Sequence, residues 1–302
     1  MLNKGLTLSI VFKASSANYG ESFGNISELK KLTRGDGESY TYISRQALRY
    51  NMIQQLGWDN TPVSAEGSGD KKVVQFSAEA TIDNYPEIDL FGYMKTIEKG
   101  KEGDGKGGAI TRSSVVRLSH AISLEPFASD LDFQTNMGLS SRLEGVNNNI
   151  VQSEQHLSYY SYTITIDLER VGVDENYKDI VISESEKASR VNALLDVIQF
   201  LYRDIKGRRE NLAPLFIIGG IYERKNPYFL NRIVIDKNKI DVKSLLDVVN
   251  SCDDTKNNTI VGIARGVFDN EDNIIKELNA VSIGDFFSQI KQKVGGYYNE
   301  SC

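Results

Sequence analysis

The chain has 302 residues, of which 40% are hydrophobic and 25% charged, as is ordinary for a soluble globular protein. A net charge of −6 argues against nucleic-acid binding, although a local basic groove can still hold phosphates. No stretch approaches the roughly 20 apolar residues of a membrane span, no signal peptide is recognisable, and two cysteines indicate a reducing cytoplasm.

The first half of the chain contains three predicted elements. Apolar and polar residues alternate over Leu6–Phe12, which predicts a strand with one buried face. The polar, Gly-rich stretch Ser15–Ser39 predicts a surface loop. Apolar residues at i+4 spacing predict a helix over Ser44–Leu56, which Gly57 is placed to end. A second strand is expected over Val74–Ile82.

The second half is richer in regular structure. The low-complexity segment Lys99–Gly108 predicts a flexible linker. Further on we expect a strand at Tyr160–Leu168, a helix at Glu186–Asp204, and strands at Leu215–Ile218, buried on both faces, and Thr259–Val267, before a terminal helix around Phe286. The strongest elements follow the order βαββαβ, which predicts an α+β fold with a ferredoxin-like, RRM-like core. A long insertion, about residues 58 to 155, would separate its halves.

The start of the predicted helix at Ser44 is a candidate phosphate-binding surface. Ser44 is a good N-cap, and Arg45 and Arg49 lie one turn apart beside Gln46. The alternative is a capped helix with solvated arginines, which the pattern alone favours.

Two further basic segments have competing interpretations. Lys206, Arg208 and Arg209 follow a helix, where cations either complement the helix dipole or contact an RNA backbone. The Gly/Lys loop that carries Lys95, Lys99, Lys101 and Lys106 is either a linker or a nonspecific contact to a nucleic-acid strand.

Catalytic and cofactor signals are missing from the sequence. His120 and His156 are the only histidines, and neither has nearby Cys or carboxylates at metal-ligand spacing. No P-loop, G-x-S-x-G or CxxC motif occurs, so we expect neither a cofactor nor a metal. Asp36 is a lone loop carboxylate, typical of a turn.

Five segments of the chain resemble one family in the expected order. Ser16–Trp58, which contains SRQALR, strongly resembles the opening of DevR-type backbone subunits of type I-B Cascade, a CRISPR effector complex. The other matches are DLFGYM (Asp89–Met94), SHAIS (Ser119–Ser123), YYSYTITIDLERVG (Tyr159–Gly172) and KNPYFLN (Lys225–Asn231).

The resemblance implies a hand-like molecule with an RRM-like palm, inserted fingers and a thumb. By position, Ser44, Arg45, Gln46 and Arg49 match contacts to the guide-RNA backbone, and Lys206–Arg209 resembles another RNA-facing segment. Met137 is a candidate wedge residue of the thumb, and Lys95–Lys106 lies in the region that contacts target DNA in relatives. The expected division is residues 1–57 palm, 58–129 fingers, 130–155 thumb and 156–302 palm.

This resemblance implies a non-catalytic subunit that oligomerises along guide RNA and presents it to target DNA, with neighbouring copies and other Cascade subunits as partners. Base pairing would then supply the sequence specificity. Two alternatives stay open: a ribonuclease that uses Asp36 or His120, and a transcriptional autoregulator, although no helix-turn-helix pattern supports the latter. The polar, Asn-rich thumb is expected to bury little core of its own and to be mobile in the free subunit.

Overall fold

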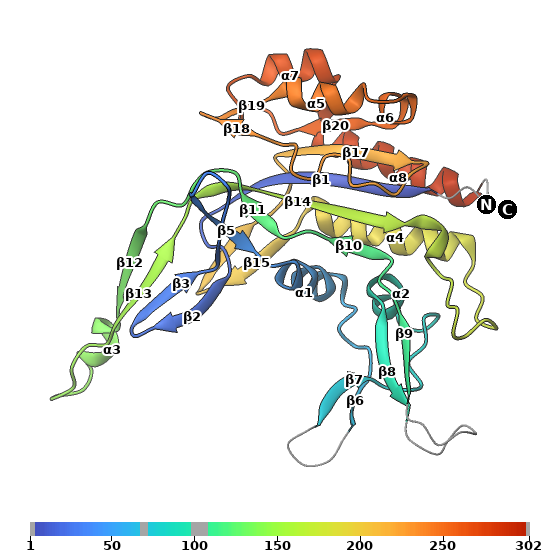
Figure 1. Ribbon diagram of the computed structural model, residues 1–302. Coiled ribbons are helices and arrows are strands. Elements are labelled where there is room, and N and C mark those ends of the chain that lie inside the picture. The colour runs from blue at the N-terminus through green and yellow to red at the C-terminus, as the bar shows by residue number, and fades with distance from the viewer. Residues whose placement is uncertain (1–3, 67–71, 98–107, 300–302) are drawn as a thin grey trace.

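The computed structural model describes residues 4–66, 72–97 and 108–299 (Figure 1). Nine strands of this part of the chain form one mixed sheet: β1 (Gly5–Ala14), β4 (Lys31–Thr33), β5 (Ser39–Ile43), β10 (Val116–Leu118), β11 (Ala121–Ser123), β14 (Ser158–Asp167), β17 (Phe216–Tyr222), β20 (Ile260–Ile263) and β21 (Val281–Ser282). Their order is β21-β20-β17-β1-β14-β11-β5-β4, and β10 also pairs with β14.

The first strand lies at the centre of this sheet. β1 pairs antiparallel with both β14 and β17, with Leu8 opposite Ile164 on one side and Gly219 on the other. Of the four strands in the predicted βαββαβ core, the first (β1) therefore lies between the third (β14) and the fourth (β17). The α+β class predicted from the sequence is confirmed. The prediction that Val74–Ile82 is the second strand of that core is wrong, because β10 and β11 pair with β14 and this segment does not.

Three helices cover one face of the sheet. They are α1 (Arg45–Leu56), α4 (Glu184–Gln199) and α8 (Ile283–Asn299), and α4 packs against both of the others. Their apolar sides bury the even-numbered residues of β1 from Leu6 to Phe12, and Leu48 and Met52 of α1 are fully buried. Ser44 caps α1, because its Oγ accepts from Ala47 N–H, and Gly57 ends it with a φ of 66°. The predicted helix here is confirmed.

Within the described part of the chain, helices cover the opposite face at the β17–β20 end of the sheet. There α5 (Val242–Val249), α6 (Asp253–Asn258) and α7 (Glu271–Leu278), with the small hairpin β18 (Ile235–Asp236) and β19 (Lys239–Ile240), enclose a second core (Figure 1). The rest of this face, around β11 and β14, is left for the cavity described below.

A four-stranded sheet projects from the body, and we call it the arm. Its strands are β12 (Asp130–Thr135), β13 (Ile150–Gln155), β3 (Ile26–Leu29) and β2 (Tyr19–Phe23), and α3 (Met137–Ser140) lies at its tip (Figure 1). β13 pairs with β3, so the stretch Ser15–Ser39 is not the surface loop that its composition predicted. Residues 130–155, where the thumb is expected, form the hairpin β12–β13, and β13 also pairs with β3.

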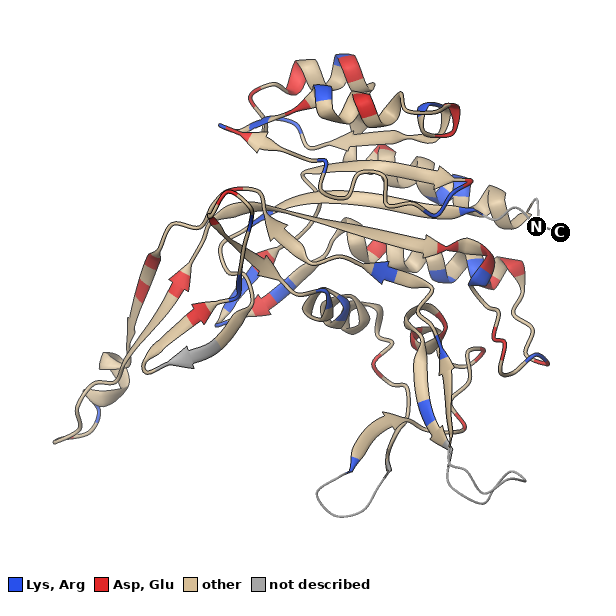
Figure 2. Ribbon diagram, viewed as in Figure 1, with Lys and Arg blue, Asp and Glu red and all other residues tan. Residues whose placement is uncertain are grey.

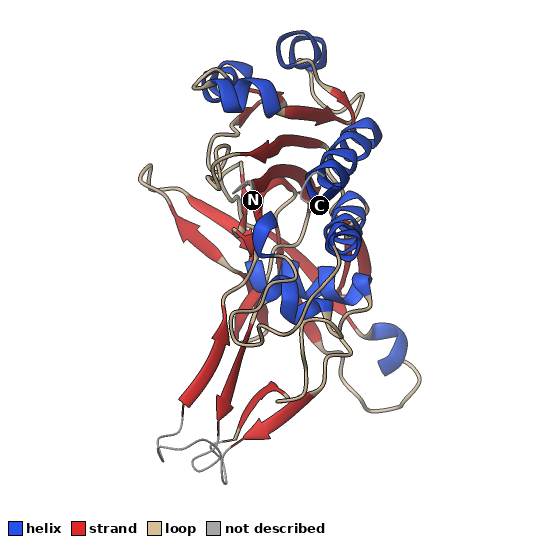
Figure 3. Ribbon diagram, turned by 90° about the vertical axis from the view of Figure 1, so that its right-hand side faces the viewer, coloured by secondary structure: helices blue, strands red, loops and turns tan. Residues whose placement is uncertain are grey.

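Two β-hairpins form a second projection, the double hairpin. It consists of β6 (Val63–Glu66), β7 (Val73–Phe76), β8 (Tyr93–Ile97) and β9 (Gly108–Arg112), and α2 (Pro86–Phe91) lies at its base. Figure 3 shows these strands extending away from the helices of the body. The strand predicted over Val74–Ile82 ends at Phe76, because the carbonyls of Ala78 and Ala80 accept from the Lys95 ammonium and not from a neighbouring strand.

Two other predicted elements are shorter than expected, and one short turn was not predicted. The helix predicted to reach Asp204 ends at Gln199, and residues beyond it form the hairpin β15 (Tyr202–Ile205) and β16 (Arg208–Asn211). The strand predicted over Thr259–Val267 covers only β20. A short 3₁₀ turn, η2 (Leu168–Arg170), follows β14.

Candidate nucleic-acid interface

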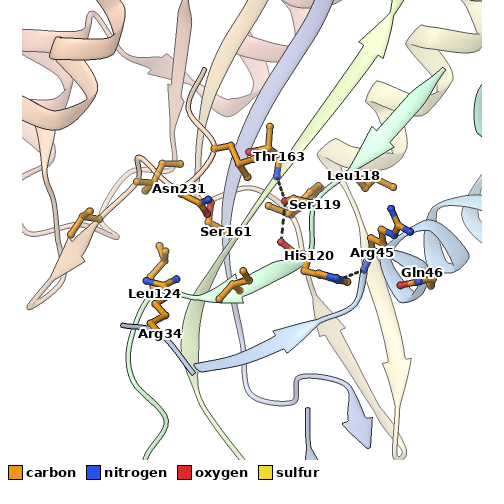
Figure 4. A pocket seen from close by; sticks show the side chains of 15 residues that line it. Arg34, Arg45, Gln46, Leu118, Ser119, His120, Leu124, Ser161, Thr163 and Asn231 are labelled. Carbon is orange, nitrogen blue, oxygen red and sulfur yellow. Dashed lines mark hydrogen bonds between the residues drawn. The ribbon is translucent and has the colours of Figure 1, made fainter. Parts of the chain in front are cut away.

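A cavity of about 730 Å³ lies on the open face of the sheet, between the start of α1, strands β11 and β14, and the segment that follows β17 (Figure 4). Its lining includes short polar side chains and two arginines. The lining residues are Arg34, Arg45, Gln46, Leu118, Ser119, His120, Ile122, Leu124, Ser161, Tyr162, Thr163, Leu230, Asn231, Ile233 and Val234. The cavity is therefore built from segments that are far apart in the sequence.

His120 fixes the start of α1 against this cavity. Its Nδ1 accepts a hydrogen bond of 3.0 Å from the backbone N–H of Arg45, and its ring centroid lies 5.1 Å from that of Tyr42. Burial lowers the pKa of His120, and the charges of Arg45 and Lys30 lower it further. Because Nδ1 accepts, the neutral ring carries its proton on Nε2, which remains a donor for a ligand.

The first turn of α1 presents Arg45 and Gln46 to the cavity. Both side chains are exposed, and no carboxylate of the described residues forms an ion pair with Arg45. Ser44 has a different role, because its Oγ accepts from both Ala47 N–H and Asn18 Nδ2 and is used in capping the helix. The free positive charge at this helix end therefore comes from Arg45.

Two smaller cavities continue from the first along α1. One of about 290 Å³ shares Arg45, Gln46 and Leu118 with the first cavity and adds Arg49 and Arg117. The next, of about 540 Å³, shares Arg49 with it and reaches Arg112 and the double hairpin. We call the three together the arginine groove; Figure 2 shows the basic residues on α1 and β10.

Among the described residues, the charged side chains that line the arginine groove are all positive. Five arginines line it: Arg34, Arg45, Arg49, Arg112 and Arg117. Among the described residues, no Asp or Glu lines any of the three cavities. The balancing carboxylates lie behind the arginines: Glu87 is 3.6 Å from Arg49, and Asp167 is 2.9 Å from Arg117. In a protein of net charge −6, the groove thus gathers five arginines, of which Arg34 and Arg45 have no ion-pair partner among the described residues.

The predicted residues Lys206, Arg208 and Arg209 lie elsewhere, on the β15–β16 hairpin at the base of the arm. The Lys206 ammonium lies 3.8 Å from the centroid of the Tyr19 ring, and Arg208 donates to Ser16 and Gln155. Arg209 forms two hydrogen bonds with Asp204. None of the three lines the arginine groove, so they do not share a site with Arg45.

The other residues predicted to contact nucleic acid differ in how exposed they are, and some lie outside the described residues. Met137 begins α3 at the tip of the arm, and 60% of its surface is exposed. Lys95 is 3% exposed; its ammonium donates to the Ala78 and Ala80 carbonyls and lies over the Tyr93 ring. This position gives Lys95 a structural role and corrects the expectation that it contacts DNA. The other three candidates, Lys99, Lys101 and Lys106, lie outside the described residues.

A buried ionic cluster anchors the double hairpin to the body. Asp89 of α2 is fully buried and accepts from Arg112 of β9 at 2.7 Å and from Arg190 of α4 at 2.9 Å. It also accepts from the backbone N–H of Gly172. Burial raises the pKa of Asp89, and the two arginines oppose that rise. The pattern of charges along the sequence gave no sign of this cluster.

Sequence reasoning also missed Arg34 and Arg117 as members of the groove. Arg117 lies in β10, immediately before the SHAIS segment, and a strand at this position would have placed it beside β14. Arg34 lies in a turn after β4, and its guanidinium lies 4.1 Å from the centroid of the Tyr40 ring. Only the folded sheet brings these two beside α1.

The candidate ribonuclease residue Asp36 has structural partners. Its carboxylate accepts from the Glu38 N–H at 3.0 Å and from the Tyr40 hydroxyl at 2.9 Å, and these hydrogen bonds lower its pKa. Within the described residues, no group of three or more His, Cys, Asp or Glu could hold a metal ion. Nor does any helix of these residues have the length and apolar character to cross a membrane.

Comparison with known proteins gives a consistent assignment. The family model of the CRISPR-associated negative auto-regulator DevR/Csa2 matches residues 6–244. The CRISPR-associated protein Cas7/Cst2/DevR of Myxococcus xanthus (strain DK1622) is 28% identical over 166 residues. The match covers 52% of this chain and 54% of the relative, so the chain spans about half the length of that relative.

Two solved structures share the fold. A chain of a CRISPR RNA-guided surveillance complex in a pre-nicking state has a TM-score of 0.56 and 10% identity, covering 95% of this chain and 100% of the other. A chain of a second CRISPR RNA-guided surveillance complex has a TM-score of 0.54 and 14% identity, covering 94% and 99%. Since the family model spans most of the sequence and the fold agrees, this chain belongs to the DevR/Csa2 family of CRISPR-associated proteins.

Proposed function

We propose that this chain is a non-catalytic RNA-binding backbone subunit of a CRISPR type I effector complex. Copies of it oligomerise along the guide RNA in the cytoplasm and present the guide for pairing with target DNA. The observation that carries this proposal is the arginine groove: among the described residues, five arginines and no carboxylate line it in a protein of net charge −6. Such a surface suits the phosphates of a polyanion.

The shape of the groove favours a single strand over a duplex. It is a chain of cavities along one helix, with aromatic and apolar side chains between the arginines, among them Phe91 and Leu118. Single-strand-binding surfaces combine these two features, because bases stack on apolar surfaces while the backbone follows the positive charge. A duplex keeps its bases stacked inside and would leave the apolar lining unpaired.

We infer that Arg45 and Gln46 contact the guide backbone directly and that Ser44 holds the helix end in place. Arg49, on the next turn of α1, also faces the groove, and its guanidinium is paired with the Glu87 carboxylate. We also propose that the palm is the nine-stranded sheet with its helices, the thumb the arm with Met137 as its wedge, and the fingers the double hairpin. Lys206 and Arg208, at the base of the arm, would meet RNA that passes between thumb and palm.

The arm supports the oligomeric part of the proposal. Large apolar side chains along it are exposed: Leu131, Phe133, Met137, Leu139, Leu143, Val146, Ile150 and Val151. A projection with so much apolar surface suits contact with a neighbouring copy. Other subunits of the effector complex are expected to bind at the ends of such an assembly.

A purified complex tests this function directly. The protein is expressed with its partner subunits, the copurified nucleic acid is extracted, and nuclease digestion is followed by sequencing. We expect protected RNA of uniform guide length that is lost at high salt. Recovery of no RNA, together with no affinity of the purified chain for single-stranded RNA, would contradict the proposal.

The family description names a negative auto-regulator, so a regulatory function is the second candidate. It predicts selective binding of the protein to a promoter duplex of its own operon, measured against a scrambled duplex of equal length. Equal, weak affinities for both duplexes and a higher affinity for single-stranded RNA would favour the guide-binding function.

A further inference from the structure

The β15–β16 hairpin lies between two parts of the molecule that the proposed function uses, the helix α1 and the arm (Figure 1). We propose that this hairpin is a brace that sets the angle at which the arm leaves the body, with Glu210 as its main positioning residue. The inference rests on the proposed function, because the angle of the arm would fix where each copy meets its neighbour along the RNA. It adds a second role to the RNA contacts proposed for Lys206 and Arg208 of the same hairpin.

The two faces of the hairpin have different partners. Antiparallel pairing places Arg203, Ile205, Arg208 and Glu210 on one face, and Tyr202, Asp204, Arg209 and Asn211 on the other. The second face is exposed, and its Arg209 and Asp204 pair with each other. Two residues of the first face, Arg203 and Glu210, are buried. The hairpin therefore turns one face toward the rest of the protein.

Glu210 joins the hairpin to the point where β1 passes into the arm. Its Oε1 accepts from the Ser15 N–H at 3.1 Å, the Ser15 hydroxyl at 2.9 Å and the Ser16 N–H at 3.0 Å. Its Oε2 accepts from Nε and Nη2 of Arg203 at 2.9 Å and 2.7 Å. One carboxylate, in a residue that is 9% exposed, thus holds both strands of the hairpin and the segment between β1 and β2. Hydrogen bonds to an ionised group are short and strong, so this contact restricts how the arm can move.

The turn of the hairpin reaches the arm itself. Lys206 and Gly207 have φ values of 46° and 75°, as in the tight type I′ turn of a two-residue hairpin. The Lys206 ammonium then lies over the Tyr19 ring of β2, at 3.8 Å from its centroid. Beside the turn, Arg208 donates to Oε1 of Gln155 in β13 at 3.0 Å. The hairpin therefore contacts two of the four strands of the arm.

The other end of the hairpin is fixed to α1. The Gln55 side chain donates through Nε2 to the Tyr202 carbonyl at 2.6 Å and accepts at Oε1 from the Tyr202 N–H at 3.3 Å. The amide thus bonds both backbone groups of one residue, as a neighbouring strand does. Because α1 also carries Arg45 and Arg49, the hairpin connects the helix that lines the arginine groove to the arm.

Glu210→Gln tests the brace, and Asp204→Asn is its matched control. Each variant replaces a carboxylate of the same hairpin with an amide of the same shape and weakens the contact to one arginine. Of the two, Glu210 bonds the segment before β2, whereas Asp204 bonds Arg209 on the exposed face. Lys206→Asn is a second test variant, because Asn is favoured in this turn and the substitution removes the contact with the Tyr19 ring.

The angle of the arm is measured in the free protein by double electron–electron resonance. Spin labels are attached at Phe133→Cys on β12 and Ser189→Cys on α4, both exposed positions, with the two cysteines of the chain replaced by serine. The labelled protein and its Asp204→Asn variant should give the same narrow distribution of distances, whereas Glu210→Gln and Lys206→Asn should give a broader one. A merely structural role would lower the melting temperature without broadening the distribution of the folded protein.

Assembly on RNA connects the brace to function. On a long single-stranded RNA, Glu210→Gln should lose the regular spacing of copies that electron microscopy measures. Its affinity for an oligonucleotide too short for two copies should be unchanged, because Glu210 lines none of the three cavities of the arginine groove. Asp204→Asn should assemble as the unchanged protein does.

Each contrary outcome has its own meaning. An unchanged distance distribution in folded Glu210→Gln would overturn the brace, and so would equal broadening in Asp204→Asn. If Glu210→Gln does not fold, Lys206→Asn takes its place in the distance measurement and the same outcomes decide. A broader distribution with regular assemblies on RNA would overturn the link between the angle of the arm and the spacing of copies. Failure of the unchanged protein to bind any RNA would reject the proposed function, whereas the distances in the free protein would still decide the brace.

Discussion

Arg45→Ala is the sharpest single test of the arginine groove. The guanidinium of Arg45 is exposed and has no ion-pair partner among the described residues, so its charge is available to one phosphate. Each phosphate contact to a single strand contributes about 0.7 to the slope of log affinity against log salt concentration. The variant should therefore bind RNA more weakly, and its salt slope should be shallower by about 0.7.

That change in slope fixes a measurable ratio. Between about 50 mM and 200 mM salt, the affinity advantage of the unchanged protein over Arg45→Ala should shrink by about 2.6-fold, because a fourfold change in salt is raised to the power 0.7. Fluorescence anisotropy with labelled single-stranded RNA at several salt concentrations measures it. The loss should be the same for RNAs of different sequence, since a phosphate contact carries no sequence information.

Two matched variants make the result interpretable. Arg265→Ala removes an exposed arginine that pairs with Glu271 and lines none of the three cavities, and it should leave the slope unchanged. Arg49→Ala should also reduce the slope by about one contact, and it additionally exposes the groove to the unpaired Glu87 carboxylate. An unchanged slope for Arg45→Ala, or an equal change for Arg265→Ala, would refute the placement of RNA along α1.

Four other predictions concern the fold, the arm and catalysis. Asp89→Ala leaves Arg112 and Arg190 buried without their shared carboxylate and should lower the free energy of unfolding by about 3–5 kcal/mol, measured by urea denaturation. Burial lowers the pKa of His156, whose Nδ1 hydrogen-bonds Thr41 Oγ1 at 2.7 Å. The fold thus favours the neutral ring, and the free energy of unfolding should fall as the pH drops below 6.5, the ordinary pKa of histidine. The variant His156→Gln should flatten this part of the plot of urea midpoint against pH. An identical plot for the variant would contradict the assignment. Deletion of 137–149, the tip of the arm, should leave the melting temperature nearly unchanged but prevent ordered assembly on RNA, seen by electron microscopy; normal assembly would place the thumb elsewhere. Finally, RNA incubated with the protein and divalent metal should stay intact on a gel, and cleavage that Asp36→Ala abolishes would overturn the non-catalytic reading.

Sequence patterns correctly predicted the helices and strands that depend mainly on neighbouring residues. The helix α1 was predicted with its cap at Ser44 and its end at Gly57, because capping and apolar spacing are set by neighbouring residues. The strands β1 and β14 were predicted for the same reason, from alternation over Leu6–Phe12 and Tyr160–Leu168, and each strand is ten residues long. The candidate contacts Arg45 and Gln46 followed from that helix, and both line the arginine groove.

Long-range pairing was beyond such patterns. Tyr19–Leu29 has the composition of a loop, but it forms the hairpin β2–β3, and β13 pairs with β3 from more than a hundred residues away. The hairpin at Lys206–Arg209 broke the predicted helix because Arg203 and Glu210 pair inside it across the turn, with their side chains buried. Lys95 was assigned to a flexible loop, while its ammonium is enclosed by the nearby Tyr93 ring and by the Ala78 carbonyl and the Tyr177 ring, which lie far from it in the sequence.

The central place of β1 in the sheet has a consequence for biosynthesis. Its two partners, β14 and β17, are made only after residues 158 and 216 have been reached. During the first half of translation, a ten-residue strand with nearly all its side chains destined for burial therefore has both edges open. Contacts of such long sequence separation form slowly, and open apolar edges invite pairing with other chains. We therefore expect the nascent chain to be most prone to mispairing before its second half emerges.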